Sequence, residues 1–208
     1  RKKLNLGIIG SGYIGLEIAS IAAKKNHEVS IFDSEERVLA RSTCSDISDF
    51  IKDKHKKNGV NFFLKTKIID IEDHKTFKKI ICDDGVEISV DEVIVGIGVK
   101  PNISLALEAG LNCDNGIVVD EDCRTSDDKI FAIGDCTYSK DLFYEKFLRI
   151  ESVHNVITRS KIASAAIADQ NRPNYETPWF WTNQYDLRIF FTGISNNYDE
   201  KITIGSIE

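Results

Sequence analysis

The feature that most constrains the fold is a glycine-rich turn, Gly10-Ser11-Gly12-Tyr13-Ile14-Gly15, near the start of the 208-residue chain. It matches the pattern G-x-G-x-x-G, follows a short apolar run at residues 4–9 and precedes a helical pattern at residues 13–25. A second apolar run, residues 27–33, ends at Asp33. Strand, turn, helix and strand in this order predict a βαβ unit and therefore a parallel sheet. We expect the helix to turn Ile14, Ile18, Ile21 and Ala22 inward.

Each glycine of the turn has a mechanical reason to be there. Gly10 permits the tight turn, Gly12 lets a pyrophosphate approach the backbone, and Gly15 allows close helix–strand packing. Amide groups at the start of the helix, where Tyr13 and Ile14 lie, would then face the phosphates. The sequence therefore predicts a dinucleotide site, and the alternative is a glycine turn that binds nothing.

The second strand carries a signal for the type of dinucleotide. Asp33 stands 23 residues after Gly10 (33 − 10 = 23), where an acidic residue can hold the adenosine ribose hydroxyls. A carboxylate there repels a 2′-phosphate, so we expect NAD rather than NADP. Arg37 and Arg41 follow closely and act against this preference.

The rest of the chain continues the α/β pattern. Helical patterns occupy residues 45–58, with Ile47, Phe50 and Ile51 inward, and residues 105–109 and 151–169. Strand patterns occupy residues 59–72, 78–90, 91–95 and 129–135. After a linker at residues 170–178, the last thirty residues alternate apolar and polar side chains, like the strands of a new domain.

Composition excludes several classes of protein. A net charge of −6 argues against a general nucleic-acid binder, and no apolar run approaches the ~18 residues of a membrane span. The five cysteines show neither zinc-site nor disulfide spacing, so we expect mostly buried thiols in the cytoplasm. The start lacks a signal-peptide pattern, and the absence of methionine predicts an internal segment of a longer protein. These cysteines are Cys44, Cys82, Cys113, Cys123 and Cys136.

Four later stretches resemble a known family. Residues 95–102, 124–136 and 149–155 are similar to those of pyridine-nucleotide flavoprotein reductases. Together with residues 178–186, which hold the two tryptophans, they resemble FAD-dependent ferredoxin reductases of the putidaredoxin reductase and rhodocoxin reductase type. The resemblance implies glutathione-reductase-type, Rossmann-like FAD and NAD domains followed by an α+β interface domain. The implied boundaries are 1–92 for the inserted NAD domain, 93–170 for the C-terminal FAD segment and 171–208 for the interface domain.

The resemblance also implies roles for individual residues. Asp135 would bind the FAD ribityl chain, the Val153 amide would meet the flavin pyrimidine carbonyl, and Trp181 would lie against the flavin. Glu17 would lie near the nicotinamide. The alternatives are a turn or cap aspartate for Asp135 and an exposed helical charge for Glu17. Further residues implied at the cofactors are Gly96, Ile97 and Gly98, where the chain crosses between domains, and Glu151 and Ser152, for which helix capping is an equal alternative.

The implied activity is transfer of electrons from NADH through FAD to an iron–sulfur ferredoxin, which serves an oxygenase such as a cytochrome P450. The implied cofactors are FAD and NAD, with no metal, nucleic-acid or membrane partner. The other FAD segment, with its own glycine motif, is not found here, so we expect this chain to hold FAD weakly. Alternatives are an NADH-dependent disulfide or peroxide reductase, and an NAD-binding flavoprotein like apoptosis-inducing factor.

Two positions depart from the family pattern. A Glu–Gln pair commonly follows the helix start in the family, whereas this chain has Thr158 and Arg159. With Lys161 they leave a basic patch, which would suit an acidic ferredoxin or simply form a solvated helix face. His154 and Trp179 are expected to have structural roles.

Overall fold

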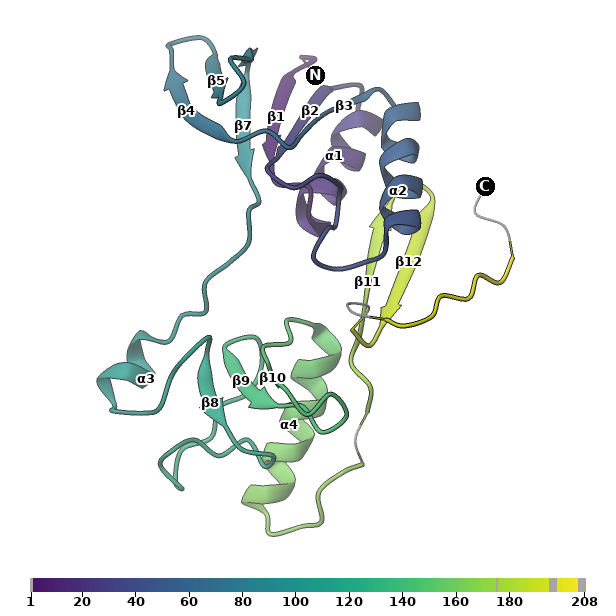
Figure 1. The fold of residues 1–208 in the computed structure, drawn as a ribbon. Helices are drawn as coiled ribbons and strands as arrows, with labels where there is room; N and C mark the ends of the chain where they lie inside the picture. Colours follow the sequence, from purple (N-terminus) through teal and green to yellow (C-terminus); the bar gives the residue numbers. More distant parts are fainter. Residues whose placement is uncertain (1, 175, 195–197, 206–208) are drawn as a thin grey trace. The chain divides into compact units, whose positions relative to one another are not determined.

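In the computed structural model the chain is described for residues 2–174, 176–194 and 198–205 (Figure 1). It divides into two compact units. Unit 1 consists of Arg1–Gly98, Thr182–Ile189 and Ile194–Glu208, and unit 2 of Val99–Trp181 and Phe190–Gly193. Among the described residues, no helix combines the length and apolarity that crossing a bilayer requires.

The core of unit 1 is a parallel sheet with the strand order β3-β2-β1-β7. The predicted βαβ unit and the α/β, Rossmann-like class are therefore confirmed. Helix α2 turns Ile51 into the core, with Ile47 and Phe50 packed against it, as expected. The elements are β1 (Asn5–Ile9), α1 (Tyr13–Lys24), β2 (Glu28–Asp33), α2 (Ser45–Lys57), β3 (Val60–Leu64) and β7 (Glu92–Val95).

Helix α1 faces the sheet with small side chains, and the expected isoleucine face is wrong for two of its members. Ile14 and Ile21 are 63% and 55% exposed, whereas Leu16 and Ala19 are fully buried. A Cβ atom at Gly15 would lie 2.1 Å from the carbonyl oxygen of Gly10, so the helix comes very close to the turn before it. Periodicity alone favours the largest apolar residues, but the close approach at Gly15 admits no side chain, and Leu16 and Ala19 rather than Ile14 and Ile21 face the core.

A second sheet in unit 1 is antiparallel, with the order β4-β5-β6. Its buried residues Ile80, Cys82 and Val90 form a small core with Phe32, whose ring stacks on Phe63 at 4.8 Å. The predicted strand region 59–72 therefore contributes to two different sheets. The strands are β4 (Ile68–Asp73), β5 (Lys78–Cys82) and β6 (Glu87–Val90).

Unit 2 holds one long helix and a three-stranded sheet with the order β10-β9-β8. The strand expected at residues 129–135 is wrong: this segment forms a single bridge, from Phe131 to Arg124. Ile130 and Ile133 are 37% and 38% exposed, so this segment is not the buried strand that the sequence predicted. The elements are α3 (Ser104–Glu108), β8 (Ile117–Val119), β9 (Thr137–Lys140), β10 (Phe147–Leu148) and α4 (Val153–Ile167).

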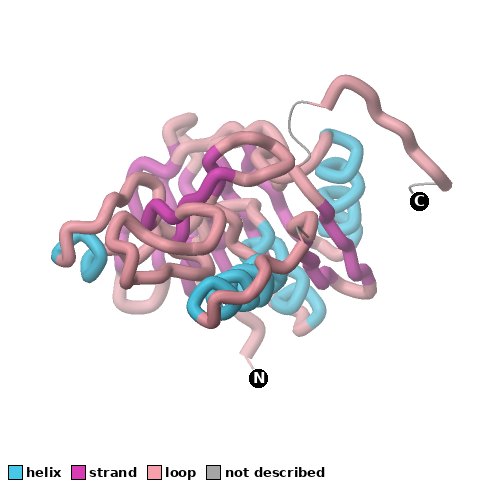
Figure 2. Tube along the Cα trace, turned by 90° about the horizontal axis from the view of Figure 1, so that it is seen from below, coloured by secondary structure: helices cyan, strands magenta, loops and turns pink. Residues whose placement is uncertain are grey.

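A hairpin of β11 (Trp179–Gln184) and β12 (Leu187–Thr192) follows, as the alternating pattern predicted. Its turn end, Thr182–Ile189, belongs to unit 1, and its open end belongs to unit 2. Beyond the hairpin, the described residues 198–205 form neither helix nor strand, and Figure 2 draws this tail as loop toward the C-terminus.

Candidate functional site

The glycine turn of unit 1 is held tightly against the end of β7. Gly10 has φ = +102°, and its amide donates to the carbonyl oxygen of Phe32 at 2.8 Å. The amide of Gly96 donates to the carbonyl oxygen of Ile9 at 2.7 Å. A Cβ atom at Gly10 would lie 2.4 Å from the carbonyl oxygen of Gly96. The turn therefore needs glycine for conformation and for space, and the structure brings Gly10, Gly15 and Gly96 together.

Gly12, unlike Gly10, has free space in front of it, because a Cβ atom there would meet nothing within 4 Å. Gly12 is also the N-cap of α1, where no side chain caps the helix and no acidic residue stands in the first turn. The first amide groups of a helix lack partners within it and attract anions. Open space in front of uncapped amides fits a pyrophosphate, so these residues fit the dinucleotide that the sequence predicted.

Asp33 lies beside this turn, at the carboxyl end of β2. Its Oδ2 atom accepts hydrogen bonds from the Ser11 amide at 2.6 Å and from the Ser11 hydroxyl at 2.5 Å. Its Oδ1 atom accepts from the Glu35 amide at 3.0 Å. The carboxylate thus fixes the turn, which the sequence did not reveal, and its role toward a ribose stays a prediction.

Both arginines that follow Asp33 contact other residues of unit 1. Arg37 donates to the carbonyl oxygens of Thr43 and Ala40 and to the Ser48 hydroxyl, at 2.7–2.8 Å. Arg41 pairs with Glu35 at 4.0 Å. Binding a 2′-phosphate with Arg37 would cost these three hydrogen bonds, whereas the Arg41 side chain is 81% exposed and its ion pair is weak. The preference for NAD stays a prediction.

Glu17 does not lie as an exposed helical charge. It is half-buried on α1, and its Oε1 atom accepts from the Thr182 hydroxyl at 2.6 Å and from the Asn183 amide at 3.0 Å. The turn end of the hairpin therefore holds this carboxylate. Beyond β7 the chain is exposed, with Ile97 65% accessible and Gly98 at φ = +111°. The expected roles of these residues at a cofactor stay predictions.

In unit 2, helix α4 begins where the sequence indicated. The Ser152 hydroxyl accepts from the Asn155 amide at 3.1 Å, so Ser152 is the N-cap, while Glu151 ion-pairs with Arg149. Val153, the first helical residue, is 58% exposed, and the first turn holds no acidic residue. The positive helix end is therefore accessible to an anionic or carbonyl group.

The loop that carries Asp135 lies next to the same helix end. Gly134 has φ = +84°, and a Cβ atom there would lie 3.6 Å from a methyl group of Val156. Asp135 itself is exposed. Unit 2 thus brings together two of the features expected to hold a flavin, the Asp135 carboxylate and the amide end of α4. These residues fit that group.

The two tryptophans stand two residues apart on β11 and therefore share one of its faces. The rings of Trp179 and Trp181 lie 5.7 Å apart, and Trp179 also contacts Phe190 and His154 at 6.2 and 5.5 Å. His154 bonds to Glu176 at 2.8 Å, and this bond together with Lys161 lowers the pKa of the Glu176 carboxyl. Trp179 and His154 accordingly have structural contacts within unit 2.

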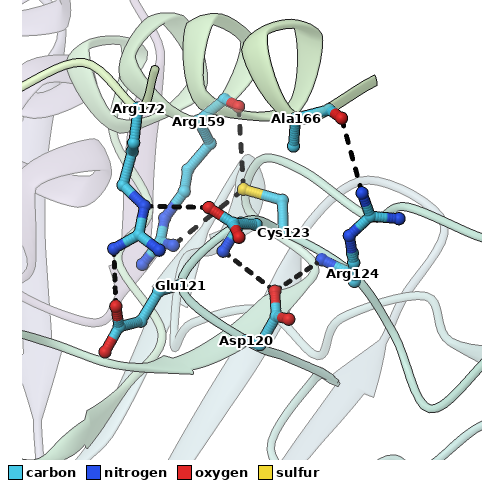
Figure 3. A network of polar contacts seen from close by, with 8 residues as sticks. Asp120, Glu121, Cys123, Arg124, Arg159, Ala166 and Arg172 are labelled. Atoms are coloured by element: carbon cyan, nitrogen blue, oxygen red, sulfur yellow. Dashed lines mark hydrogen bonds and ion pairs between the residues drawn. The ribbon is translucent and has the colours of Figure 1, made fainter. Parts of the chain in front are cut away.

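Figure 3 shows that Arg159 is not a free surface charge. Its guanidinium bonds to the Ser139 hydroxyl and lies 4.0 Å from the Cys123 sulfur. The Cys123 thiol is buried, which raises its pKa, and donates to the Arg159 carbonyl oxygen at 3.7 Å. Lys161 pairs with Glu176 at 3.6 Å. The basic patch expected on this helix is therefore reduced by internal contacts.

Sequence reasoning missed one cluster in unit 1. His55 on α2 is fully buried and bonds to Gln184 and Tyr185 in the hairpin turn. One signal was available, because His55 stands four residues after the buried Ile51 and therefore shares its helix face. Its partners, 129 and 130 residues away, could not be identified from sequence.

Comparisons with known proteins agree with these features. Residues 1–168 match the family described as pyridine nucleotide-disulphide oxidoreductase. The chain is 38% identical to putidaredoxin reductase CamA of Pseudomonas putida, over 97% of this chain and 49% of that protein. It is 37% identical to a 5,5'-dehydrodivanillate O-demethylase ferredoxin reductase subunit of Sphingobium sp., over 95% of this chain and 49% of that protein.

Among solved structures, the covalent putidaredoxin reductase–putidaredoxin complex contains a chain with a TM-score of 0.94 and 38% identity. The match covers 98% of this chain and 50% of that one, so the present chain spans about half the length of these relatives. Because the family match extends over most of its residues, the chain belongs to the pyridine nucleotide-disulphide oxidoreductase family.

Proposed function

We propose that the protein is an NADH-dependent flavoprotein reductase that passes electrons from NADH through FAD to an iron–sulfur ferredoxin. The observation that carries this proposal is the 38% identity to putidaredoxin reductase over 97% of the chain. The related crystal structure is a complex of that reductase with putidaredoxin, which supports a ferredoxin as partner.

Unit 1 binds NADH in this proposal. The open space at Gly12 and the uncapped amides of α1 receive the pyrophosphate, and Asp33 stands where the adenosine ribose would lie. Glu17, one turn further along α1, is directed toward the nicotinamide end. A 2′-phosphate would have to displace the hydrogen bonds that already engage Arg37, which supports NADH over NADPH.

Unit 2 binds part of FAD. When bound, FAD supplies the group that takes two electrons as a hydride and returns them singly. Asp135 would accept a hydrogen bond from the ribityl chain, the Val153 amide would donate to the pyrimidine ring, and the helix end would stabilise negative charge there. Trp181 would shield the ring from water.

The downstream electron acceptor is a ferredoxin that serves an oxygenase such as a cytochrome P450. The name of the O-demethylase subunit supports this type of system. We place the reaction in the cytoplasm, since all five cysteines, Cys44, Cys82, Cys113, Cys123 and Cys136, are free thiols.

The test is anaerobic stopped-flow mixing of the FAD-loaded protein with NADH, followed by a second mix with an oxidised ferredoxin. We expect flavin absorbance to fall with NADH, to fall much less with NADPH, and to recover as the ferredoxin is reduced. A flavin that NADH reduces but that reacts with disulfides or peroxide instead of ferredoxin would favour the alternative reductase. A flavin that NADH does not reduce would refute the proposal.

A further inference from the structure

The turn end of the β11–β12 hairpin contacts both helices of unit 1. Thr182 and Asn183 bond to Glu17 on α1, and Gln184 and Tyr185 bond to His55 on α2. All of these residues belong to unit 1. Three of the side chains, those of His55, Thr182 and Gln184, belong to residues at most 1% exposed. Burying a polar group destabilises the fold unless the group forms a hydrogen bond, so the hydrogen bonds of these three side chains are important for the stability of unit 1.

The contacts form one chain of hydrogen bonds with a fixed direction. The Glu17 carboxylate can only accept, so the Thr182 hydroxyl must donate its hydrogen to Oε1, at 2.6 Å. The Thr182 oxygen then accepts from the Gln184 side-chain amide at 3.3 Å. The Gln184 oxygen accepts from His55 Nε2 at 2.8 Å, and the Tyr185 hydroxyl donates to His55 Nδ1 at 3.0 Å. The carboxylate thus determines the amide orientation of Gln184 and the tautomer of His55.

The protonation states agree with this direction. Burial lowers the pKa of His55, which favours a neutral ring. The hydrogen bonds to Gln184 and Tyr185 then assign its hydrogen to Nε2. Burial raises the pKa of Tyr185 to about 12, so the hydroxyl retains its hydrogen. The Tyr185 ring also packs edge-on against the His55 ring, with centroids 4.8 Å apart. Each hydrogen bond in this series therefore joins one donor to one acceptor at physiological pH.

We propose that Thr182, Gln184, His55 and Tyr185 are positioning residues that fix the Glu17 carboxylate at the nicotinamide end of the NADH site. This inference rests on the proposed function, because Glu17 is placed near the nicotinamide there. The exposed contacts that flank the turn, such as the Lys54–Asp186 ion pair, contribute little by comparison, since water and salt screen them. The four residues as a set are called the relay below.

The relay ends at Glu17, close to the proposed phosphate site. Glu17 stands four residues after Tyr13, one helical turn beyond the amides expected to bind phosphate. A substitution in the relay should therefore leave phosphate binding intact and disturb the nicotinamide end. The rate of flavin reduction should then fall while the NADH affinity stays nearly the same, which a purely structural contact would not produce.

The first test is long-range ¹H–¹⁵N NMR of His55 in the chain, at neutral pH. The relay requires the tautomer with its hydrogen on Nε2 and Nδ1 as an acceptor. Observation of the opposite tautomer, or of rapid exchange between the two, would overturn the proposal without any substitution.

The second test compares Thr182→Val with Thr182→Ser. Valine has nearly the same shape but can neither donate to Glu17 nor accept from Gln184, whereas serine can do both. Hydrogen exchange at the Asn183 amide should be about 5- to 30-fold faster in the valine variant and close to the original rate in the serine variant. Thr66→Val is the matched control, because Thr66 is also buried in unit 1 but its hydroxyl bonds to the Leu64 carbonyl oxygen.

The third test uses the FAD-loaded protein and measures flavin reduction by NADH. We expect Thr182→Val to lower the rate at saturating NADH about 5- to 30-fold with little change in KM, and Thr182→Ser to restore it. A valine variant that matches the original protein in exchange and in rate would overturn the relay. If the original protein is not reduced by NADH, the proposed function fails, while the tautomer and the exchange rates still decide whether the relay exists.

Discussion

A single methyl group at Gly15 should destabilise unit 1 severely. In Gly15→Ala the new Cβ atom would lie 2.1 Å from the carbonyl oxygen of Gly10 and 3.4 Å from a methyl group of Ile8. The distance from Cβ to the Gly10 oxygen would have to grow by more than about 1 Å to reach van der Waals contact. Neither atom can move by a side-chain rotation, because the Cβ atom is fixed to the helix backbone and the oxygen belongs to the backbone of the turn. Gly10 has no room to yield, since it is itself pressed against Gly96.

Overpacking of this kind costs about 1–3 kcal/mol, and a backbone clash belongs at the upper end. For a chain of this size, a loss of about 3 kcal/mol lowers the melting temperature by roughly 6–12 °C. Thermal unfolding followed by circular dichroism measures the shift, and urea unfolding at 25 °C gives the free energy. A Gly15→Ala variant that unfolds at the same temperature as the original chain would refute this account of the close approach.

Three further predictions concern single groups. In Asp33→Asn the free energy of unfolding measured with urea should fall by about 1–3 kcal/mol, because at least one donor, such as the Ser11 amide, loses its charged acceptor. An unchanged urea midpoint would contradict this. Because burial holds the folded pKa of His55 below its usual 6.5, its contribution to stability should be complete above about pH 6.5 and decline as the pH falls toward the folded pKa. Urea midpoints between pH 5 and 8 check this, and His55→Gln should flatten that part of the profile. Ser152→Ala should cost about 1 kcal/mol and speed hydrogen exchange in the first turn of α4, whereas Ser152→Thr should not.

The parts of the fold that depend on local pattern could be predicted from sequence. The glycine turn between two apolar runs fixed the order of β1, α1 and β2, and the residue Ser152 before an apolar helix marked the start of α4. Long-range contacts could not be predicted in the same way. Nothing near Glu17 in sequence indicates that Thr182 binds it, 165 residues away.

Two errors have physical causes. The inward face of α1 was misassigned because close packing on the sheet favours Gly15 and Ala19 over the larger Ile14 and Ile21. Residues 129–135 have the composition of a strand, but a strand requires a hydrogen-bonded neighbour, and the described residues supply a single bridge. The glycine turn, Asp33 at the end of β2 and the start of α4 lie where the motifs placed them, because these motifs encode local backbone geometry. The roles of the site residues toward a cofactor stay predictions.

The central claim is that a nicotinamide dinucleotide lies across the open backbone at Gly12. The most direct measurement is calorimetric titration of the chain and of its Gly12→Ala variant with NADH, together with thermal unfolding of both. A Cβ atom at Gly12 meets nothing within 4 Å, so the variant should lose no more than about 1 kcal/mol, the cost of alanine at the N-cap of α1. The methyl group would occupy the space of the pyrophosphate, so NADH affinity should fall at least about tenfold, equivalent to about 1.4 kcal/mol. A stable Gly12→Ala variant that binds NADH as tightly as the original chain would contradict the claim.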